Sequence, residues 1–310
     1  MRHPIDPKVD CVFKALLGAE SNQALLRHFL NAMLGSALPS PIIDTEILNP
    51  YNERESLDDK LSIVDVKARD EAGRQHQIEI QLLDHPDLPA RILYGWADLY
   101  SAQLHSGDDY DALRPTYAIW LLGETLLREI QEYAHCYRLR DEQGRTFLDH
   151  GGIWLFELSK FHLDGVETEQ QRWLKFFNEA ERLDEQALPA WMQTREMTQA
   201  MSTLKAFSEK ERTYHAYQAR QNYLREQRSI QRHFAELRAE AERQRETIEQ
   251  ERKTIKRERE AKEQACKARE QACKAREQER EAKEQEREAK EAALAEVERL
   301  KRLLKGQQNG

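Results

Sequence analysis

The chain has 310 residues, enough for one or two globular domains of roughly 100–200 residues each. Charged residues make up 34% of it, hydrophobic residues only 39%, and the mean hydropathy is -0.86. A transmembrane helix is excluded, because no run of roughly 18 apolar residues occurs. The first residues, Met1 to Asp6, also lack the apolar stretch of a secretory signal. The composition therefore predicts a cytoplasmic protein with no membrane partner.

The charge is unevenly divided along the chain. From residue 209 onward there are 27 Lys and Arg and 22 Glu, so residues 1–208 carry about −13 and the rest about +5. No Gly or Pro occurs between Pro189 and Gly306, and a compact domain needs such residues for its turns. We therefore expect a globular domain over 1–208 and a long charged helix over 209–310. The four cysteines form no Cys-x-x-Cys pair, so neither a zinc site nor a disulfide framework is indicated.

Apolar spacing and turn residues predict the elements of the front part in chain order. They are helices ending at Gly18 and Gly35, strand 42–48, a hairpin of strands 61–70 and 77–82, a helix from Pro89 to Gly107, strand 115–122, an extended segment 133–140, strand 153–158, and helices around 173–177 and 197–204. The core order is thus helix, strand, strand, strand, helix, strand.

The hairpin is the most informative stretch. Residues 61–70 and 77–82 each alternate between apolar and polar side chains, as strands with two different faces do. Between them, residues 71–73 (Glu-Ala-Gly) suit a three-residue loop with glycine where a positive φ is needed. Closing this loop with Asp70 opposite Arg74 fixes the register of the two strands.

In that register Asp65 lies directly opposite Glu79, with Cβ atoms about 4.5–5.5 Å apart. Like charges so placed destabilise a sheet, so the pair needs a proton, a cation or an arginine. Magnesium fits because it takes one or two carboxylates and keeps waters for reaction. The alternative is a half-exposed sheet whose polar face is solvated and whose acidic pair is incidental. A loop of two or four residues would separate the two carboxylates onto opposite faces.

Several short motifs accompany this hairpin over about the first 210 residues. They are 10–14 (Asp-Cys-Val-Phe-Lys) with Gly18, Asp65, 70–73 (Asp-Glu-Ala-Gly), 78–81 (Ile-Glu-Ile-Gln), 91–94 (Arg-Ile-Leu-Tyr), 103–107 (Gln-Leu-His-Ser-Gly), 157–161 (Glu-Leu-Ser-Lys-Phe) and 173–176 (Trp-Leu-Lys-Phe). In this order they resemble the PD-(D/E)XK nuclease fold. More closely they resemble the Rpn group of recombination-promoting nucleases, which are also described as PD-(D/E)XK nuclease family transposases.

The resemblance implies an α/β fold with a restriction-endonuclease-like αβββαβ core, C-terminal helices and a long charged helix. It also implies a metal-dependent endonuclease that hydrolyses phosphodiester bonds in DNA, linked to recombination or mobile elements. Asp65 and Glu79 would hold Mg²⁺ or another divalent cation. Gln81 occupies the position where the wider superfamily has lysine, and an amide can only orient water or bind phosphate. Lys67, on the face of Asp65, is a candidate for the missing cation, with a solvated strand lysine as the alternative.

Other polar residues are weaker candidates. Lys60 and Arg91 would contact DNA phosphates or simply carry surface charge. Asp10 and Glu46 are candidate outer carboxylates, although helix capping and strand-edge solvation are the favoured interpretations. The polar neighbours of His76 favour a surface position for it.

The tail contains a seven-residue repeat, seen in two copies of Glu-Gln-Ala-Cys-Lys-Ala-Arg followed by two of Glu-Gln-Glu-Arg-Glu-Ala-Lys. Steps of seven from Ile248 lead through basic residues to Val297, so the seam is apolar only at its ends. Many Glu and Lys residues are spaced four apart in the favourable order. We expect a largely solvated, charge-stabilised helix, with a weak coiled coil that forms a homo-oligomer through residues 209–305 as the alternative.

Two functional hypotheses follow. The first is an active metal-dependent DNA endonuclease. The second is a catalytically inactive, nuclease-like interaction protein that oligomerises through its C-terminal helix. The acidity of the front domain counts against a nuclease, because proteins that bind nucleic acid usually show a basic footprint.

Overall fold

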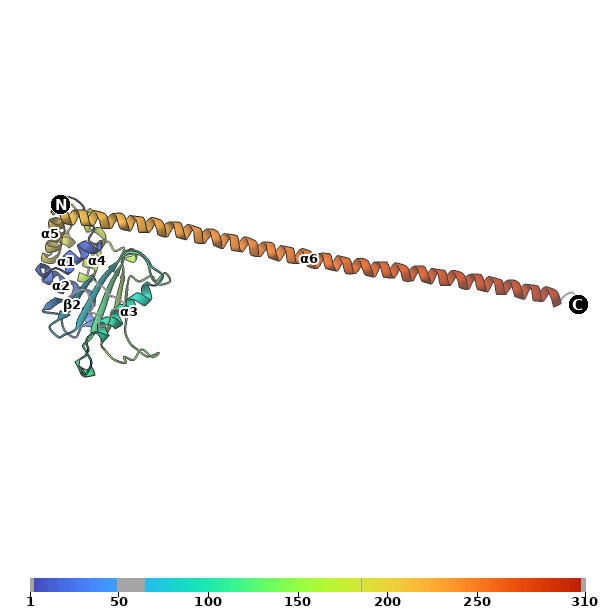
Figure 1. Ribbon diagram of the computed structural model, residues 1–310, viewed down its shortest axis with the longest axis horizontal. Coiled ribbons are helices and arrows are strands. Elements are labelled where there is room, and N and C mark those ends of the chain that lie inside the picture. Colours follow the sequence, from blue (N-terminus) through green and yellow to red (C-terminus); the bar gives the residue numbers. More distant parts are fainter. Residues whose placement is uncertain (1–2, 49–64, 185, 308–310) are drawn as a thin grey trace. The chain divides into compact units, whose positions relative to one another are not determined.

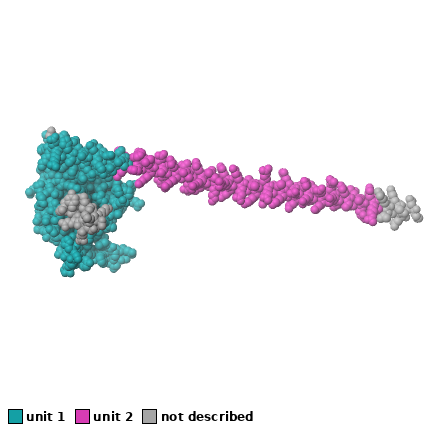
Figure 2. Space-filling view, in the orientation of Figure 1, with its two compact units in different colours: residues 1–230 teal, residues 231–310 magenta. Residues whose placement is uncertain are grey.

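The structure, a computed structural model, describes residues 3–48, 65–184 and 186–307. Lys60 and residues 61–64 of the expected hairpin lie outside the described residues. The chain divides into two compact units, residues 1–230 and 231–310 (Figure 2). Among the described residues, no helix carries an apolar stretch long enough to span a bilayer.

The helices and strands follow the expected order (Figure 1). The helices are α1 (Asp10–Leu17), α2 (Gln23–Leu34), α3 (Leu88–Ser101), α4 (Glu169–Glu179), α5 (Arg195–Glu209) and α6 (Glu211–Gln307). The strands are β1 (Thr45–Leu48), β2 (Val66–Asp70), β3 (Gln75–Gln81), β4 (Thr116–Leu122), β5 (Ala134–Tyr137) and β6 (Gly151–Glu157). Short 3-10 turns cover Glu20–Asn22, Gly35–Ala37, Tyr110–Ala112, Leu158–Lys160, Ala180–Arg182 and Ala190–Met192.

The six strands form one mixed sheet in the order β1-β2-β3-β4-β6-β5. The β1–β2, β2–β3 and β5–β6 pairs are antiparallel, and β4 runs parallel to both β3 and β6. A parallel pair needs a crossover connection, and α3 supplies it between β3 and β4. The predicted fold class is confirmed: the mixed α/β architecture with its long C-terminal helix is consistent with a restriction-endonuclease-like fold.

The larger core lies between one face of the sheet and α1, α2, α4 and α5. Helix α1 contributes Phe13 and α2 contributes Phe29, and both rings pack against Phe177 of α4. Thr168 begins α4 with a reciprocal capping box to Gln171, which satisfies two orphan donors of the first turn. These helices hold the end of α1 against the β2–β3 hairpin.

The other face of the sheet is covered by α3, so the expectation of a solvated polar face is wrong. On β3 the polar side chains Gln75, Gln77 and Glu79 are all buried. Gly95 of α3 makes this close approach possible, because a Cβ there would lie 3.1 Å from Nε2 of Gln77. A sequence that alternates polar and apolar residues is here buried on both faces.

The hairpin register is confirmed. Val66 pairs with Ile78, the amide of Asp70 donates to the carbonyl of Arg74, and Gly73 has a φ of 78°. This register also buries His76, with no exposed surface, so the predicted surface position is wrong. The reason is that residue 76 shares the core face of β3 with residues 78 and 80.

His76 belongs to a buried ionic cluster at the hairpin turn. Oδ2 of Asp70 lies 2.6 Å from Nε of Arg74 and 2.8 Å from Nε2 of His76. Burial alone would raise the pKa of Asp70, but its hydrogen bonds and the nearby positive charge lower it. Burial lowers the pKa of His76, although the Asp70 carboxylate opposes that shift, and the ring stacks on Tyr117 with centroids 5.4 Å apart.

Helix α6 begins as part of the first unit, where Tyr217 and Leu224 are buried. The hydroxyl of Tyr217 accepts a hydrogen bond from the amide of Asp6. Beyond residue 231 nearly every described side chain is exposed. The predicted Glu–Lys pairs are present there; the Lys267–Glu263 and Lys283–Glu279 ion pairs are both 2.6 Å long.

Candidate functional site

Two acidic side chains meet at the end of the hairpin, where β2 begins and β3 ends. Asp65 is fixed by two contacts: Oδ2 accepts from the amide of Ile80 at 3.0 Å, and Oδ1 lies 3.3 Å from Nζ of Lys14. The Asp65 side chain is 13% exposed. Burial raises its pKa above the ordinary value, while the Ile80 amide and Lys14 oppose that shift.

Glu79 is the more deeply buried carboxyl, with 4% of its surface exposed. Its Oε1 accepts from Nε2 of Gln77 at 3.2 Å. Burial, and then the charge of Asp65, raise the pKa of Glu79 to about 8, although Arg91 and Lys14 favour its ionised form. The structure thus brings together the two predicted carboxylates in an environment that disfavours two negative charges.

Gln81, at the end of β3, is held between two neighbours. Its Nε2 donates to the carbonyl of Leu83 at 2.9 Å, and its Oε1 accepts from Nη1 of Arg91 at 3.3 Å. The Arg91 guanidinium lies 5.7 Å from the ring centroid of Trp120, a cation–π distance. Arg91 is therefore anchored beside the carboxylate pair.

Lys14, which the sequence analysis did not single out as a site residue, contacts this carboxylate pair through Asp65. It lies on α1, about fifty residues before Asp65 in the chain, and its side chain is 43% exposed. Gly18 ends α1 close to β2, since a Cβ at Gly18 would lie 3.3 Å from Cγ2 of Val66. The available signal was the motif at residues 10–14, which ends in this lysine.

Lys67 lies elsewhere on the hairpin. It pairs with Gln77 in the strand register and lines a cavity of about 380 Å³ together with Arg69 and Arg114. Neither Asp65 nor Glu79 lines that cavity. The structure places the ammonium of Lys14 in direct contact with Asp65.

The two candidate outer carboxylates are engaged in ion pairs. Oδ1 of Asp10 lies 3.0 Å from Nε of Arg220, and Oε2 of Glu46 lies 2.6 Å from Nη2 of Arg69. Within the described parts of the chain, no three His, Cys, Asp or Glu side chains converge as a metal cluster. Of the described side chains, the carboxylates of Asp65 and Glu79 are the ones placed to hold a cation at the hairpin.

The hairpin donors suit a hard divalent cation. Mg²⁺ is commonly held by one or two carboxylates and retains several waters. The buried Oε1 of Gln77, next to Glu79, has no hydrogen-bond partner in the described structure, so a polar atom beside the carboxylates is left unsatisfied. Both carboxyls also have raised pKa values, which a bound cation would reverse.

Glu157, from another motif of the sequence, has a structural task. Its buried carboxylate accepts from the amides of Leu126 and Leu127 and lies 2.5 Å from Nζ of Lys160. That Nζ also donates to the carbonyls of Leu127 and Ile130. Burial would raise the pKa of Glu157, but these donors lower it. Glu157 and Lys160 therefore hold the loop that follows β4 through hydrogen bonds to its main chain.

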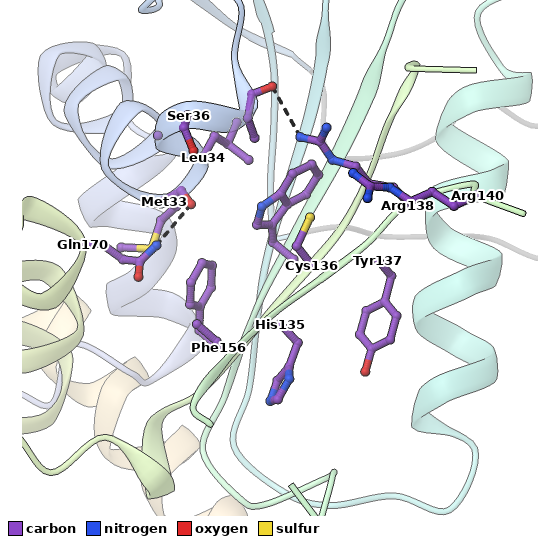
Figure 3. A pocket seen from close by; sticks show the side chains of 14 residues that line it. Met33, Leu34, Ser36, His135, Cys136, Tyr137, Arg138, Arg140, Phe156 and Gln170 are labelled. Atoms are coloured by element: carbon purple, nitrogen blue, oxygen red, sulfur yellow. Dashed lines mark hydrogen bonds between the residues drawn. The ribbon is translucent and has the colours of Figure 1, made fainter. Parts of the chain in front are cut away.

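A cavity of about 680 Å³ lies apart from the hairpin, between the C-terminal end of α2 and the edge strand β5 (Figure 3). Arg138 spans it: Nη2 donates to the carbonyl of Ala37, and the guanidinium lies 5.4 Å from the Trp154 ring centroid. Cys136 and Arg140 also line this cavity. None of the predicted site residues lines this cavity.

Comparison with known proteins gives one match. Curated proteins yield no match, and neither do solved structures. The family model for PD-(D/E)XK nuclease family transposases matches residues 7–233. This range covers the hairpin, the sheet and the helices on both its faces. The chain therefore belongs to the PD-(D/E)XK nuclease family transposases.

Proposed function

We propose that this protein is a Mg²⁺-dependent DNA endonuclease that hydrolyses phosphodiester bonds in transposition or recombination. Membership of the family supports a nuclease linked to transposition. The observation that carries the proposal for this chain is the pairing of Asp65 and Glu79 at the end of the β2–β3 hairpin, with the pKa of Glu79 raised to about 8. Perturbed carboxyls beside a cation are typical of catalytic sites.

Asp65 and Glu79 would hold the divalent cation. When bound there, the cation would polarise a phosphodiester oxygen and lower the pKa of a water molecule. Glu79 must lose its proton to act as a ligand, so cation affinity rises with pH up to about 8. The Ile80 amide already orients the Asp65 carboxylate, so cation binding would require little further ordering of this side chain.

Lys14 supplies the fixed positive charge that the motif lacks at Gln81. Its Nζ contacts Asp65, yet its side chain is 43% exposed, so the ammonium can meet a phosphate arriving from solvent. A positioned cation stabilises the charge that develops on phosphate in the transition state. Because Nζ has three donors, contact with Asp65 leaves others for the substrate.

Gln81 and Arg91 act as a positioning pair. The guanidinium of Arg91 holds the Gln81 carbonyl oxygen, which fixes the plane of the amide. Arg91 also adds positive charge beside Glu79, whose ionised form it favours. Together with Lys14 it gives an acidic domain a local cationic rim, so DNA affinity should be modest and strongly salt-dependent.

Nicking of supercoiled plasmid tests the proposal. Wild-type protein should nick the plasmid in the presence of Mg²⁺, and the reaction should stop when EDTA is added. The variants Asp65→Ala and Glu79→Ala should each nick about 100-fold more slowly than wild type, or slower still. Glu46→Ala is the matched control, because this strand carboxylate is ion-paired and exposed, and it should retain full activity. Absence of nicking by the wild type, together with no Mg²⁺ heat in calorimetry, would instead support an inactive interaction protein.

A second comparison identifies the cation. Lys14→Gln should lower the nicking rate by about 100-fold, with partial recovery in Lys14→Arg and unchanged circular dichroism. Lys67→Gln, on the same hairpin but at another cavity, should stay within about twofold of wild type. The reverse ranking would assign the role to Lys67.

A further inference from the structure

The long helix carries an apolar seam that no part of the same chain covers within the described residues. The large apolar side chains exposed along α6 include Phe234, Leu237, Ile248 and Ile255, each between 46% and 57% exposed. Val297 and Leu300, near the far end, are 47% and 50% exposed. Successive members of this set are 3, 11, 7, 42 and 3 residues apart, so all of them fall on the a and d positions of one coiled-coil heptad frame between residues 234 and 300.

The middle of that seam is charged in an ordered way. The a positions hold Lys262, Arg269, Arg276, Lys283 and Lys290. The d positions hold Glu251, Glu258, Ala265, Ala272, Glu279 and Glu286. In a parallel, in-register pair each a position packs against the same a position of the second copy, and likewise for d. All nine charged layers would then set like charges against each other.

Reversing one helix changes this outcome, because a positions then face d positions. We infer that α6 pairs with α6 of a second copy of this chain as an antiparallel coiled coil, with Phe234 opposite Leu300. This alignment puts Leu237 opposite Val297 and Ala241 opposite Ala293. Apolar layers therefore match at both ends of the pair, whereas Ile248 and Ile255 lie opposite Glu286 and Glu279.

The same alignment brings complementary charges together. It sets Glu258 opposite Arg276 and Glu251 opposite Lys283. Lys283 and Lys290 already pair with Glu279 and Glu286 of their own helix. In contrast, no ion pair within the described chain engages Glu258 or Arg276. A second, antiparallel copy supplies each of them with a partner.

Distance measurement between spin labels tests the orientation in the full-length protein. The exposed cysteines 136, 266 and 273 are changed to serine, and Lys253→Cys places one label on the outer face of the helix. Residue 253 then lies opposite residue 281 of the second copy, which separates the two labels by roughly 45 Å. A parallel pair would give roughly 20 Å. The short distance, or a monomer in sedimentation at 100 µM, would overturn the inference.

A charge exchange tests the partner residues. Glu258→Arg should weaken dimerisation about tenfold in analytical ultracentrifugation, because it sets two arginines opposite each other in two layers. The double variant Glu258→Arg with Arg276→Glu should restore the wild-type dissociation constant. In a parallel pair both variants merely exchange one like-charge layer for another. Equal dissociation constants for all three proteins would therefore refute the antiparallel arrangement.

Discussion

Replacing Glu79 by glutamine removes the ionisable group at the centre of the site while keeping its size and its acceptor oxygen. In the metal-free wild type the folded protein holds a proton on Glu79 up to a pKa of about 8, whereas the unfolded chain releases it near 4.5. The stability that this proton provides is complete below pH 4.5 and is lost as the pH rises toward 8. Glu79→Gln has no such proton to lose.

The size of the effect follows from the two pKa values. Each unit of difference corresponds to about 1.36 kcal/mol, so the variant should gain about 3 kcal/mol over wild type between pH 4.5 and 6.5, and about 5 kcal/mol by pH 8. For a domain of this length, about 5 kcal/mol corresponds to roughly 10–20 °C in Tm. The side chain is only 4% exposed, so solvent screens little of this difference.

Thermal unfolding of metal-free protein at pH 5 and pH 8.5 measures this difference in stability between Glu79→Gln and wild type. Glu79→Gln should melt well above wild type at pH 8.5 and close to it at pH 5, while showing no nicking. Adding 10 mM Mg²⁺ at pH 8.5 should raise the Tm of wild type but not of the variant. Glu46→Gln, an exposed carboxylate, should track wild type throughout. A variant that melts below wild type at pH 8.5 would refute the buried, proton-holding Glu79.

Three further outcomes are expected. Gly95→Leu should lower both Tm and nicking, because a Cβ there already lies 3.1 Å from β3. Asp70→Asn should cost about 3 kcal/mol in urea unfolding, because it leaves the buried Arg74 guanidinium with only the more distant Glu71 carboxylate, 3.8 Å away. The control is Asp141→Asn, in an exposed turn where Asp141 pairs with Arg145 as Asp70 pairs with Arg74. This variant should leave the midpoint of urea unfolding nearly unchanged. Glu157→Gln should speed amide exchange at residues 126 and 127, whose N–H groups it would hold less tightly.

Local pattern was enough to predict the hairpin. Alternation over 77–82 and the loop at 71–73 fixed which residues face each other, and the observed pairing of Val66 with Ile78 is the predicted one. A strand register depends on neighbours close in sequence and on loop length. For that reason Asp65 and Glu79 could be brought together from the sequence alone.

Contacts between distant segments could not be predicted in the same way. Lys14 reaches Asp65 only because α1 packs on the core face of the sheet, and no periodicity in either segment encodes that meeting. The burial of Gln77 likewise depends on α3 crossing the opposite face, where Gly95 permits close approach. His76 is a different case, because its shared face with Ile78 was visible in the alternation and its polar neighbours were given too much weight.

The acidity of the front domain is less opposed to DNA cleavage than the net charge suggests. The count over residues 1–208 leaves out Arg220, which pairs with Asp10 of that domain. Glu79 itself keeps a proton below about pH 8 in the absence of metal. Net charge governs long-range attraction, whereas the field at a site depends on groups within a Debye length, about 8 Å at physiological salt. At the end of the hairpin those groups include Lys14 and Arg91, and a bound divalent cation would make the local field that a phosphate meets positive.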